Sequence, residues 1–157
     1  EVVSALDHPA AEKAPFGQAV SRRALDGGGW LSWVVAVDDI SPLESRLGRA
    51  ARAGHRIRPD GHDLNWKQIG VLDVMADAQL PFFVEWGCDT TEHPSSGAGP
   101  VSVGRIEIAG DPDTISAWLG EPKDHPLDDI EVDWVESEDP GIVAVWFQTP
   151  QGSIRID

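Results

Sequence analysis

One succession of predicted elements occurs twice in this chain, and it constrains the fold more than any other feature. Each occurrence begins with an apolar run rich in β-branched residues, continues with a helix that has proline at its first position, and ends with three more strand-like runs. Repetition on this scale is typical of a duplicated structural unit. We therefore predict an α+β fold of two tandem βαβββ units with curved mixed or antiparallel sheets, over 29–87 and 101–157, with a loop at 88–100.

The two helices are predicted from the residues at their starts. In the first unit Ser41 stands directly before Pro42 and three residues before Glu44, a pattern that predicts a capping box. Gly54 is then predicted to end this helix, because glycine accepts the left-handed conformation that follows a last helical turn. In the second unit the pair Asp111-Pro112 predicts the same kind of start.

Alternation along the strands divides each sheet into two faces. In the first unit Trp33 and Val35 are expected under the helix, and Ser32 is expected on the opposite, concave face. In the second unit one face is apolar and the other is polar. The apolar face is predicted to carry Ile106, Ile108, Val132, Trp134, Ile154 and Ile156. The polar face is predicted to carry Arg105, Glu107, Glu131, Asp133 and Arg155.

The first residues look like the middle of a unit rather than its start. Glu1-Val2-Val3 precedes the pair His8-Pro9 at nearly the same distance as Glu85 precedes His93-Pro94. We therefore expect Glu1-Val2-Val3 to end the fourth strand of a preceding βαβββ unit that lies outside this sequence. The remainder of 1–28 is rich in Ala, Gly, Pro and charge, and we interpret it as a linker.

Charge and cysteine content exclude several classes of function. The formal net charge of −15, from 27 acidic and 12 basic residues, disfavours nucleic acid and anionic membranes as partners, since both require clustered Lys and Arg. The single cysteine, Cys88, forms neither an internal disulfide nor a thiolate zinc site. No apolar run reaches the length of a membrane span and no signal-peptide pattern occurs, so we expect a cytoplasmic protein.

The stretches "RIRPDGHDLNW" and "LPFFVEWG", together with the repeated βαβββ succession, resemble the bacterial glyoxalase-like domain proteins of the vicinal oxygen chelate superfamily. The resemblance covers essentially the whole chain. For metal-dependent members of the superfamily it implies ligands on the first and fourth strands of paired units. These positions fall at Ser32 and Glu85 here, and at Glu1 for the preceding unit. Because serine is a poor primary ligand, the resemblance implies an incomplete metal site. A set formed by His55, His62 and Glu85 is an alternative.

A pocket is predicted on the concave face of the first unit. The candidate ligand-binding residues are Ser32, Arg58, Trp66, Phe83 and Glu85. At the mouth of the pocket, Arg58 would donate two parallel hydrogen bonds to a carboxylate or phosphate group. Two alternatives stand beside this interpretation: Glu85 could pair with Arg56 or Arg58 at the rim, and the aromatic side chains could belong to the core.

These observations support one leading function and two others. We interpret the chain as a glyoxalase-like domain that binds a small organic molecule in the cup of a sheet, with no catalytic residue or cofactor assigned. One alternative is a metal-dependent lyase or dioxygenase, completed by a divalent metal and by ligands from the preceding unit. The other is a non-catalytic dimerisation module. Because an uncovered apolar sheet favours association, we expect a homodimer that pairs the "WLSWVVAV" strands of two copies.

Overall fold

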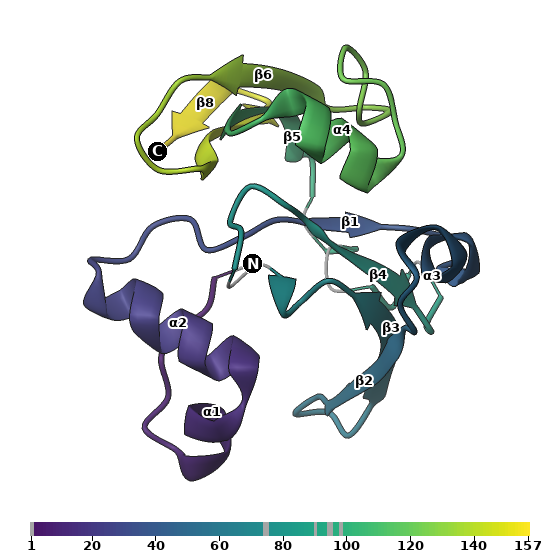
Figure 1. The fold of residues 1–157 in the computed structure, drawn as a ribbon. Coiled ribbons are helices and arrows are strands. Elements are labelled where there is room, and N and C mark those ends of the chain that lie inside the picture. Colours follow the sequence, from purple (N-terminus) through teal and green to yellow (C-terminus); the bar gives the residue numbers. More distant parts are fainter. Residues whose placement is uncertain (1, 74–75, 90, 94–95, 98) are drawn as a thin grey trace.

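The computed structural model describes residues 2–73, 76–89, 91–93, 96–97 and 99–157, and it arranges the strands in two separate sheets (Figure 1). The first half of the chain forms α1 (Pro9–Lys13), α2 (Pro15–Leu25), β1 (Val34–Ala36), α3 (Ser41–Leu47), β2 (Arg52–Ile57), β3 (Asp63–Ile69) and β4 (Phe82–Trp86). The second half forms β5 (Ser102–Ala109), α4 (Pro112–Leu119), β6 (Glu131–Val135), β7 (Gly141–Thr149) and β8 (Gly152–Ile156). The predicted α+β class is confirmed. Among the described residues no helix is long and apolar enough to cross a membrane.

The first sheet has the strand order β1-β4-β3-β2. β1 runs parallel to β4, whereas β4 with β3 and β3 with β2 are antiparallel. The register brings Gly54, Trp66 and Trp86 side by side across three strands. In Figure 1 this sheet is curved, with α3 on one side and the helices α1 and α2 on the other. The strand that opens the unit is therefore at one edge, beside the strand that closes it.

The second sheet repeats the succession of elements but not the strand order. Its order is β6-β5-β7-β8, so that the opening strand β5 lies inside the sheet. β5 pairs in parallel with β6, the strand that follows α4, and antiparallel with β7. Chain order could not distinguish these two arrangements, because strand neighbours are chosen by contacts between residues far apart in sequence. The predicted faces are confirmed: Ile106 pairs with Val132, and Glu107 pairs with Asp133.

Two helices occupy the segment that the sequence predicted as a linker, which corrects that interpretation. α1 and α2 each begin with proline, and the ring nitrogen Nδ1 of His8 accepts a hydrogen bond from the Ala10 N–H at 3.1 Å at the start of α1. The two helices approach closely at Gly17, where an added Cβ would lie 2.1 Å from the Ala11 carbonyl oxygen. Alanine-rich composition had suggested flexibility, but alanine is the strongest helix former.

The cap predicted for α3 is wrong at both ends. Ile40 is the N-cap residue and Ser41 is the first helical residue, so no capping box forms. Glu44 instead accepts a hydrogen bond from the Ala51 N–H at 2.7 Å, which ties the segment after the helix back to it. The helix ends at Gly48, in the left-handed conformation at φ 61°, rather than at Gly54. For α4 the predicted cap at Asp111 is confirmed, and its side chain accepts from the Asp113 N–H at 3.1 Å.

One hydrophobic core joins the two units through their helix-covered sides. Its buried members are Trp33, Ile40, Leu43, Ile69 and Phe83 of the first unit and Ile106, Ile108, Ile115 and Leu119 of the second. Polar contacts cross the same boundary. The Trp118 indole N–H donates to the Pro81 carbonyl at 2.8 Å, and Arg46 donates to the carbonyls of Ala117 and Leu119 at the end of α4. The second unit therefore packs on the α3 side of the first sheet, and the other face is turned towards α1 and α2.

Candidate functional site

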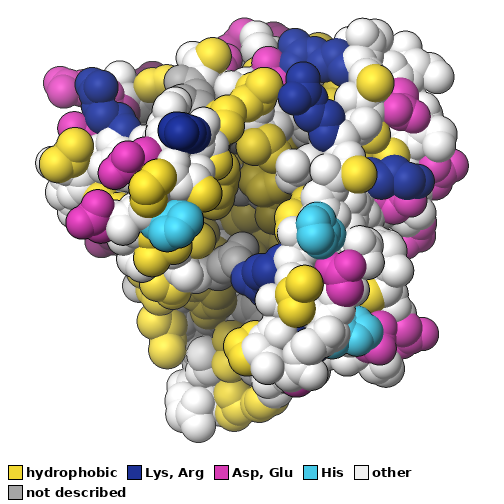
Figure 2. Space-filling view, turned by 90° about the horizontal axis from the view of Figure 1, so that it is seen from below, with side chains coloured by type: hydrophobic (Ala, Val, Ile, Leu, Met, Phe, Trp, Pro, Cys, Tyr) yellow, Lys and Arg dark blue, Asp and Glu magenta, His cyan; other side chains and the backbone are white. Residues whose placement is uncertain are grey.

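The face of the first sheet opposite α3, here called the open face, carries Gly54, Trp66 and Trp86. Residues that are paired across strands point to the same side of a sheet, and neighbours along a strand alternate. Arg56 and Leu64 therefore belong to the open face as well. Figure 2 shows this side of the molecule hollowed, with hydrophobic side chains on the floor and walls of the hollow and Lys or Arg side chains at its rim.

A row of rings crosses the open face. The Trp66 side chain packs against Gly54, where an added Cβ would come within 2.5 Å of its ring. Trp66 and Trp86 have ring centroids 5.7 Å apart, and the His93 ring stands edge-on to Trp86 at 4.8 Å. Such tilted and edge-to-face arrangements are the favourable ones for aromatic pairs. The row attaches the loop after β4 to the sheet, because His93 lies in that loop.

A groove of about 370 Å³ lies beside this row, between the sheet and the loop after β4. Its described lining residues are Arg56, Arg58, Leu64, Thr91, Glu92, His93, Ser96 and Gly97. β2 and its end supply the two arginines, β3 supplies Leu64, and the loop supplies the opposite wall. Leu64, which is only 2 % exposed, is the apolar side chain of the described lining, and the other described lining residues are polar, charged or glycine.

Ion pairs define the rim of the groove. Arg58 lies 3.1 Å from Asp60, and His62 lies 3.6 Å from Glu92. All four side chains are 40 to 55 % exposed, so solvent screens these contacts strongly. The pair of His62 with Glu92 joins the turn after β2 to the loop after β4. The turn after β2 and the loop after β4 are therefore linked by an exposed contact that costs little to open.

Glu85 lies on the opposite face from this groove. Its carboxylate accepts a hydrogen bond from Lys67 Nζ at 2.7 Å and another from the Ile40 N–H at 2.8 Å. The Lys67 hydrogen bond, followed by the Ile40 N–H, holds the pKa of the Glu85 carboxyl below its usual range. Its ion-pair partner is Lys67, not Arg56 or Arg58 as the alternative interpretation proposed. Glu85 therefore anchors the start of α3 to the sheet.

The structure separates the five candidate ligand-binding residues. Arg58 lines the groove and Trp66 lies on the open face beside it. Phe83 is 2 % exposed and stacks on Trp118 of α4 at 6.2 Å, within the shared core. Glu85 occupies the same side as Phe83, and Ser32 is half-buried before the start of β1. Sequence alternation placed Phe83 and Glu85 together correctly, but the register inferred from the resemblance assigned them to the wrong side of the sheet.

The residues present do not fit the metal site that the superfamily implies. Within the described residues, no group of three or more His, Cys, Asp and Glu side chains is placed to hold a metal ion. Glu85 is engaged with Lys67, and His62 is paired with Glu92 on the other side of the sheet. His55 pairs with Asp63 at 3.2 Å. Glu1 lies outside the described residues. We therefore derive no chemical step through a metal.

Sequence reasoning missed the contribution of the loop after β4. His93 had been used only for its spacing from Glu85, and neither Thr91 nor Glu92 had been singled out. Arg56 had appeared only as a partner for Glu85. Strand alternation was the available signal. Arg56 follows Gly54 by two residues, and Gly54 lies opposite Trp66, so Arg56 is on the same face of the sheet as Trp66. The position of the loop could not have been inferred in this way, because it depends on contacts made in three dimensions.

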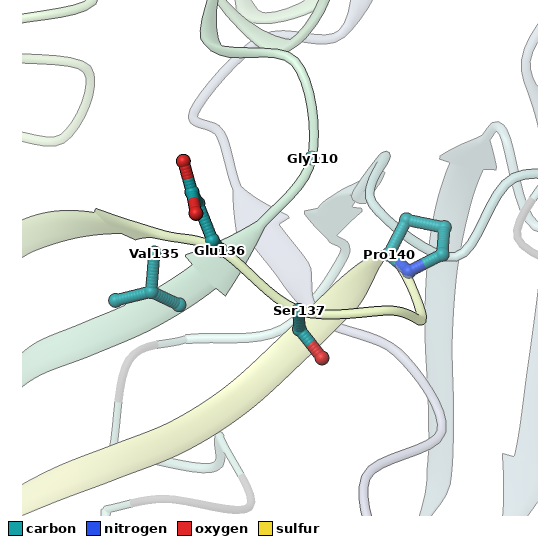
Figure 3. Close-up of a pocket in the computed structure, with 5 residues that line it drawn as sticks. All are labelled: Gly110, Val135, Glu136, Ser137 and Pro140. Atoms are coloured by element: carbon teal, nitrogen blue, oxygen red, sulfur yellow. The ribbon is translucent and has the colours of Figure 1, made fainter.

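A second hollow of about 420 Å³ lies at one end of the second sheet, lined by Gly110, Val135, Glu136, Ser137 and Pro140 (Figure 3). In Figure 3 the Glu136 and Ser137 side chains point to opposite sides of the segment after β6. The hollow thus has no set of polar groups converging on one point. The groove on the open face brings two arginines, a histidine and a carboxylate together around one space, and it is the better candidate for a binding site.

The first sheet, curved and with α3 on one side, has the architecture of a glyoxalase-like fold. A family model described as "Glyoxalase-like domain" matches residues 1–122, and the chain belongs to this family. The resemblance inferred from the sequence is therefore confirmed.

A solved structure gives independent support for the fold. The crystal structure of a hypothetical protein from Staphylococcus aureus superposes with a TM-score of 0.67 at 12 % identity, covering 97 % of this chain and 78 % of that chain. At this identity the likeness concerns the fold alone. A search of the curated proteins finds no match.

Proposed function

We propose that this glyoxalase-like domain binds a small organic molecule in the groove on the open face of the first sheet. The observation that carries the proposal is the groove itself, of about 370 Å³, formed where the loop after β4 folds back over β2 and β3. Its volume is within the range of small-molecule sites, and its lining brings guanidinium, imidazole, hydroxyl and carboxylate groups around one space.

The test is a screen of small organic molecules by thermal shift, because a ligand that binds the folded state alone raises the melting temperature. The groove is then filled by Ser96→Phe, at an exposed lining position whose side chain can be enlarged with little effect on the fold. Gln151→Phe, at the exposed turn between β7 and β8, is the matched control.

We expect a molecule that stabilises the wild-type chain to lose its effect on Ser96→Phe and to keep it on Gln151→Phe. Equal stabilisation of both variants would place the binding site elsewhere. Failure of a broad screen with the wild-type chain would count against the function itself.

We also propose that the domain forms a homodimer through the edge of β1, the third function considered above. Of the four edge strands, β2, β6 and β8 carry charged side chains such as Arg52, Asp133 and Arg155. The run from Trp30 to Val37 around β1 carries none, and Val34 is 50 % exposed. Charges on an edge strand are a common protection against association, so an unprotected apolar edge favours pairing.

Light scattering after size-exclusion chromatography measures the oligomeric state. We expect a dimer that Val34→Lys converts to a monomer, while Ile57→Lys, at a 67 % exposed position on the opposite edge strand, leaves it intact. A monomeric wild-type chain at high concentration would exclude this proposal, and a dimer unaffected by Val34→Lys would assign it to another surface.

A further inference from the structure

Three consecutive glycines, Gly27, Gly28 and Gly29, join the helices α1 and α2 to the first sheet. All three have positive φ, at 100°, 82° and 97°, a region that residues with a side chain rarely adopt. An added Cβ at Gly27 or Gly28 would meet no described atom within 4 Å, so this side of the turn is not packed against the described part of the protein. A short run of small residues at the end of a helix has the properties of a hinge.

The segments on the two sides of these glycines are fastened to different parts of the molecule. Before the turn, α1 and α2 are attached to each other, and the Gln18 side chain of α2 donates to the Glu12 carbonyl of α1 at 2.9 Å. After the turn, Trp33 belongs to the core shared by both units, and its indole N–H donates to the Gln79 carbonyl at 3.0 Å. The two helices, here called the helical hairpin, therefore form one small body that the turn connects to the rest.

Two buried donors beside the turn lack a partner in this position of the helical hairpin. Arg23 Nε lies in the last turn of α2 and Trp30 Nε1 directly follows the glycines; within the described residues neither buried atom has a hydrogen-bond partner. The Arg23 guanidinium reaches over the turn, since an added Cβ at Gly29 would lie 2.5 Å from its Nη2. Buried N–H groups are nearly always paired, and leaving one unpaired costs free energy. This cost narrows the free-energy gap between the observed position and another one.

The helical hairpin lies on the side of the first sheet that carries the open face (Figure 1). Figure 2 shows the hollow on this side, with hydrophobic side chains on its floor and walls. Contact between water and an apolar surface is unfavourable, so a movement of the helical hairpin that narrows the hollow gains free energy. The groove of the candidate site lies on the same face, and the same movement limits access to it.

We propose that the helical hairpin is a hinged lid, which turns as one body about Gly27, Gly28 and Gly29 and closes over the open face of the first sheet. In the present structure the lid stands open, with the Arg23 and Trp30 donors unpaired at its base. Closure about a few small residues is a common form of protein motion and takes microseconds to milliseconds. The inference goes beyond the proposed function, because it concerns a movement of the chain without a ligand.

Distances between two spin labels, measured by double electron–electron resonance on the full chain with Cys88→Ser, test the inference. Labels at Lys13→Cys in α1 and Ala53→Cys in β2, both exposed positions, lie on the two sides of the hinge. Labels at Ala53→Cys and at the exposed Gln151→Cys join the two units that share one core, and they are the matched control. We expect two distances for the first pair, one of them shorter than in the present structure, and a single distance for the control.

A substitution at the base of the lid measures the effect of the unpaired donor. Arg23→Met keeps the length of the side chain and removes the donor, so the open position loses part of its cost. We expect the fraction of the shorter distance to fall about tenfold, as the cost of one buried unpaired donor predicts. Arg22→Met, which removes only an exposed ion pair with Asp26, is the control and should leave this fraction unchanged.

Three results would overturn the inference. The first is a single distance for the hinge pair, as narrow as that of the control pair, since it would show that the helical hairpin is fixed to the sheet. The second is an additional distance that is longer than in the present structure, since the helical hairpin would then move away from the open face. The third is an equal fraction of the shorter distance in Arg23→Met and Arg22→Met.

Discussion

The two sheets of this molecule arise from the same succession of elements, yet they treat their charged side chains differently. On the polar face of the second sheet each arginine is matched by a carboxylate: Arg105 lies 3.1 Å from Asp133, and Arg155 lies 2.8 Å from Glu107. Trp146 completes the network, since its N–H donates to Glu107 at 2.6 Å and Arg105 lies over its ring. The arginines on that face are therefore paired with carboxylates of the same face.

On the open face of the first sheet the arginines are aligned along one strand instead. Arg52 lies opposite Gln68 and Arg56 opposite Leu64, so the cross-strand partners are neutral. Arg58 takes its carboxylate partner, Asp60, from the turn that follows β2 rather than from a neighbouring strand. The difference teaches that a duplicated succession of elements specifies the scaffold, and that the pairing of charged side chains across strands differs between its two copies.

The two units share one hydrophobic core, and the removal of core side chains is expected to lower the stability of the protein the most. Phe83→Ala should destabilise the protein by about 3–5 kcal/mol, because it leaves a cavity in the core shared by both units. Ile115→Ala in α4, fully buried in the same cluster, should cost about 2–5 kcal/mol. Chemical denaturation measures both.

Cooperativity is the sharper readout for this pair of variants. Each substitution should shift a single unfolding transition, followed by far-ultraviolet circular dichroism and by tryptophan fluorescence. If Phe83→Ala unfolded the first unit while the second retained its own later transition, the units would be independent and the shared core would not couple them.

The ring row on the open face can be disturbed without touching the second sheet. Gly54→Ala places a Cβ 2.5 Å from the Trp66 ring, so that the indole must shift. We expect a destabilisation of about 1–3 kcal/mol and a changed Trp66 indole resonance in the nuclear magnetic resonance spectrum. Gly97→Ala, where an added Cβ meets nothing within 4 Å, is the matched control. Unchanged Trp66 resonances in Gly54→Ala would contradict this packing.

Contacts between the units can also be weakened from the polar side. Arg46 of α3 donates at 2.9 and 2.8 Å to the carbonyls of Ala117 and Leu119, which end α4. Arg46→Ala should cost about 1 kcal/mol, because it leaves these carbonyls to solvent and removes a positive charge from a helix C-terminus. Arg22→Ala, which removes an exposed pair within α2, is the control and should have no measurable effect. Equal stability of the two variants would show that Arg46 does not link the units.

The smallest expected effect concerns pH. Arg155, followed by Trp146, lowers the pKa of the Glu107 carboxyl from its ordinary value of 4.5 to about 2. Because the folded pKa lies below the unfolded one, this stabilisation is fully present above pH 4.5 and is lost as the pH falls through about 2. Between these pH limits the free energy of unfolding, measured by chemical denaturation, should fall less steeply with decreasing pH for Glu107→Gln than for the wild-type chain. If the stability of Glu107→Gln fell as steeply as that of the control Glu131→Gln, the stabilising role of the Glu107 carboxylate would be contradicted.

Several features of the protein follow from local sequence and were predictable. Proline sits at the first or second position of each helix because its missing N–H is not needed there, and this located the starts of α3 and α4. Period-two alternation separated Trp33 from Ser32 and divided the second sheet into an apolar and a polar face. The family motifs and the α+β class could likewise be inferred from the chain alone. All of these depend on residues close together in sequence.

Other features were decided by tertiary structure. The strand order differs between the two sheets, Glu85 pairs with Lys67 beneath the N-terminus of α3, and His93 reaches back to Trp86 to form the wall of the groove. Each of these depends on which distant segments pack together, and the energy of such pairings is not encoded in any single stretch. The sequence by itself thus determined the elements and their faces. Tertiary packing decided which face of the first sheet the second unit covers, because the second unit buries its apolar side against Phe83.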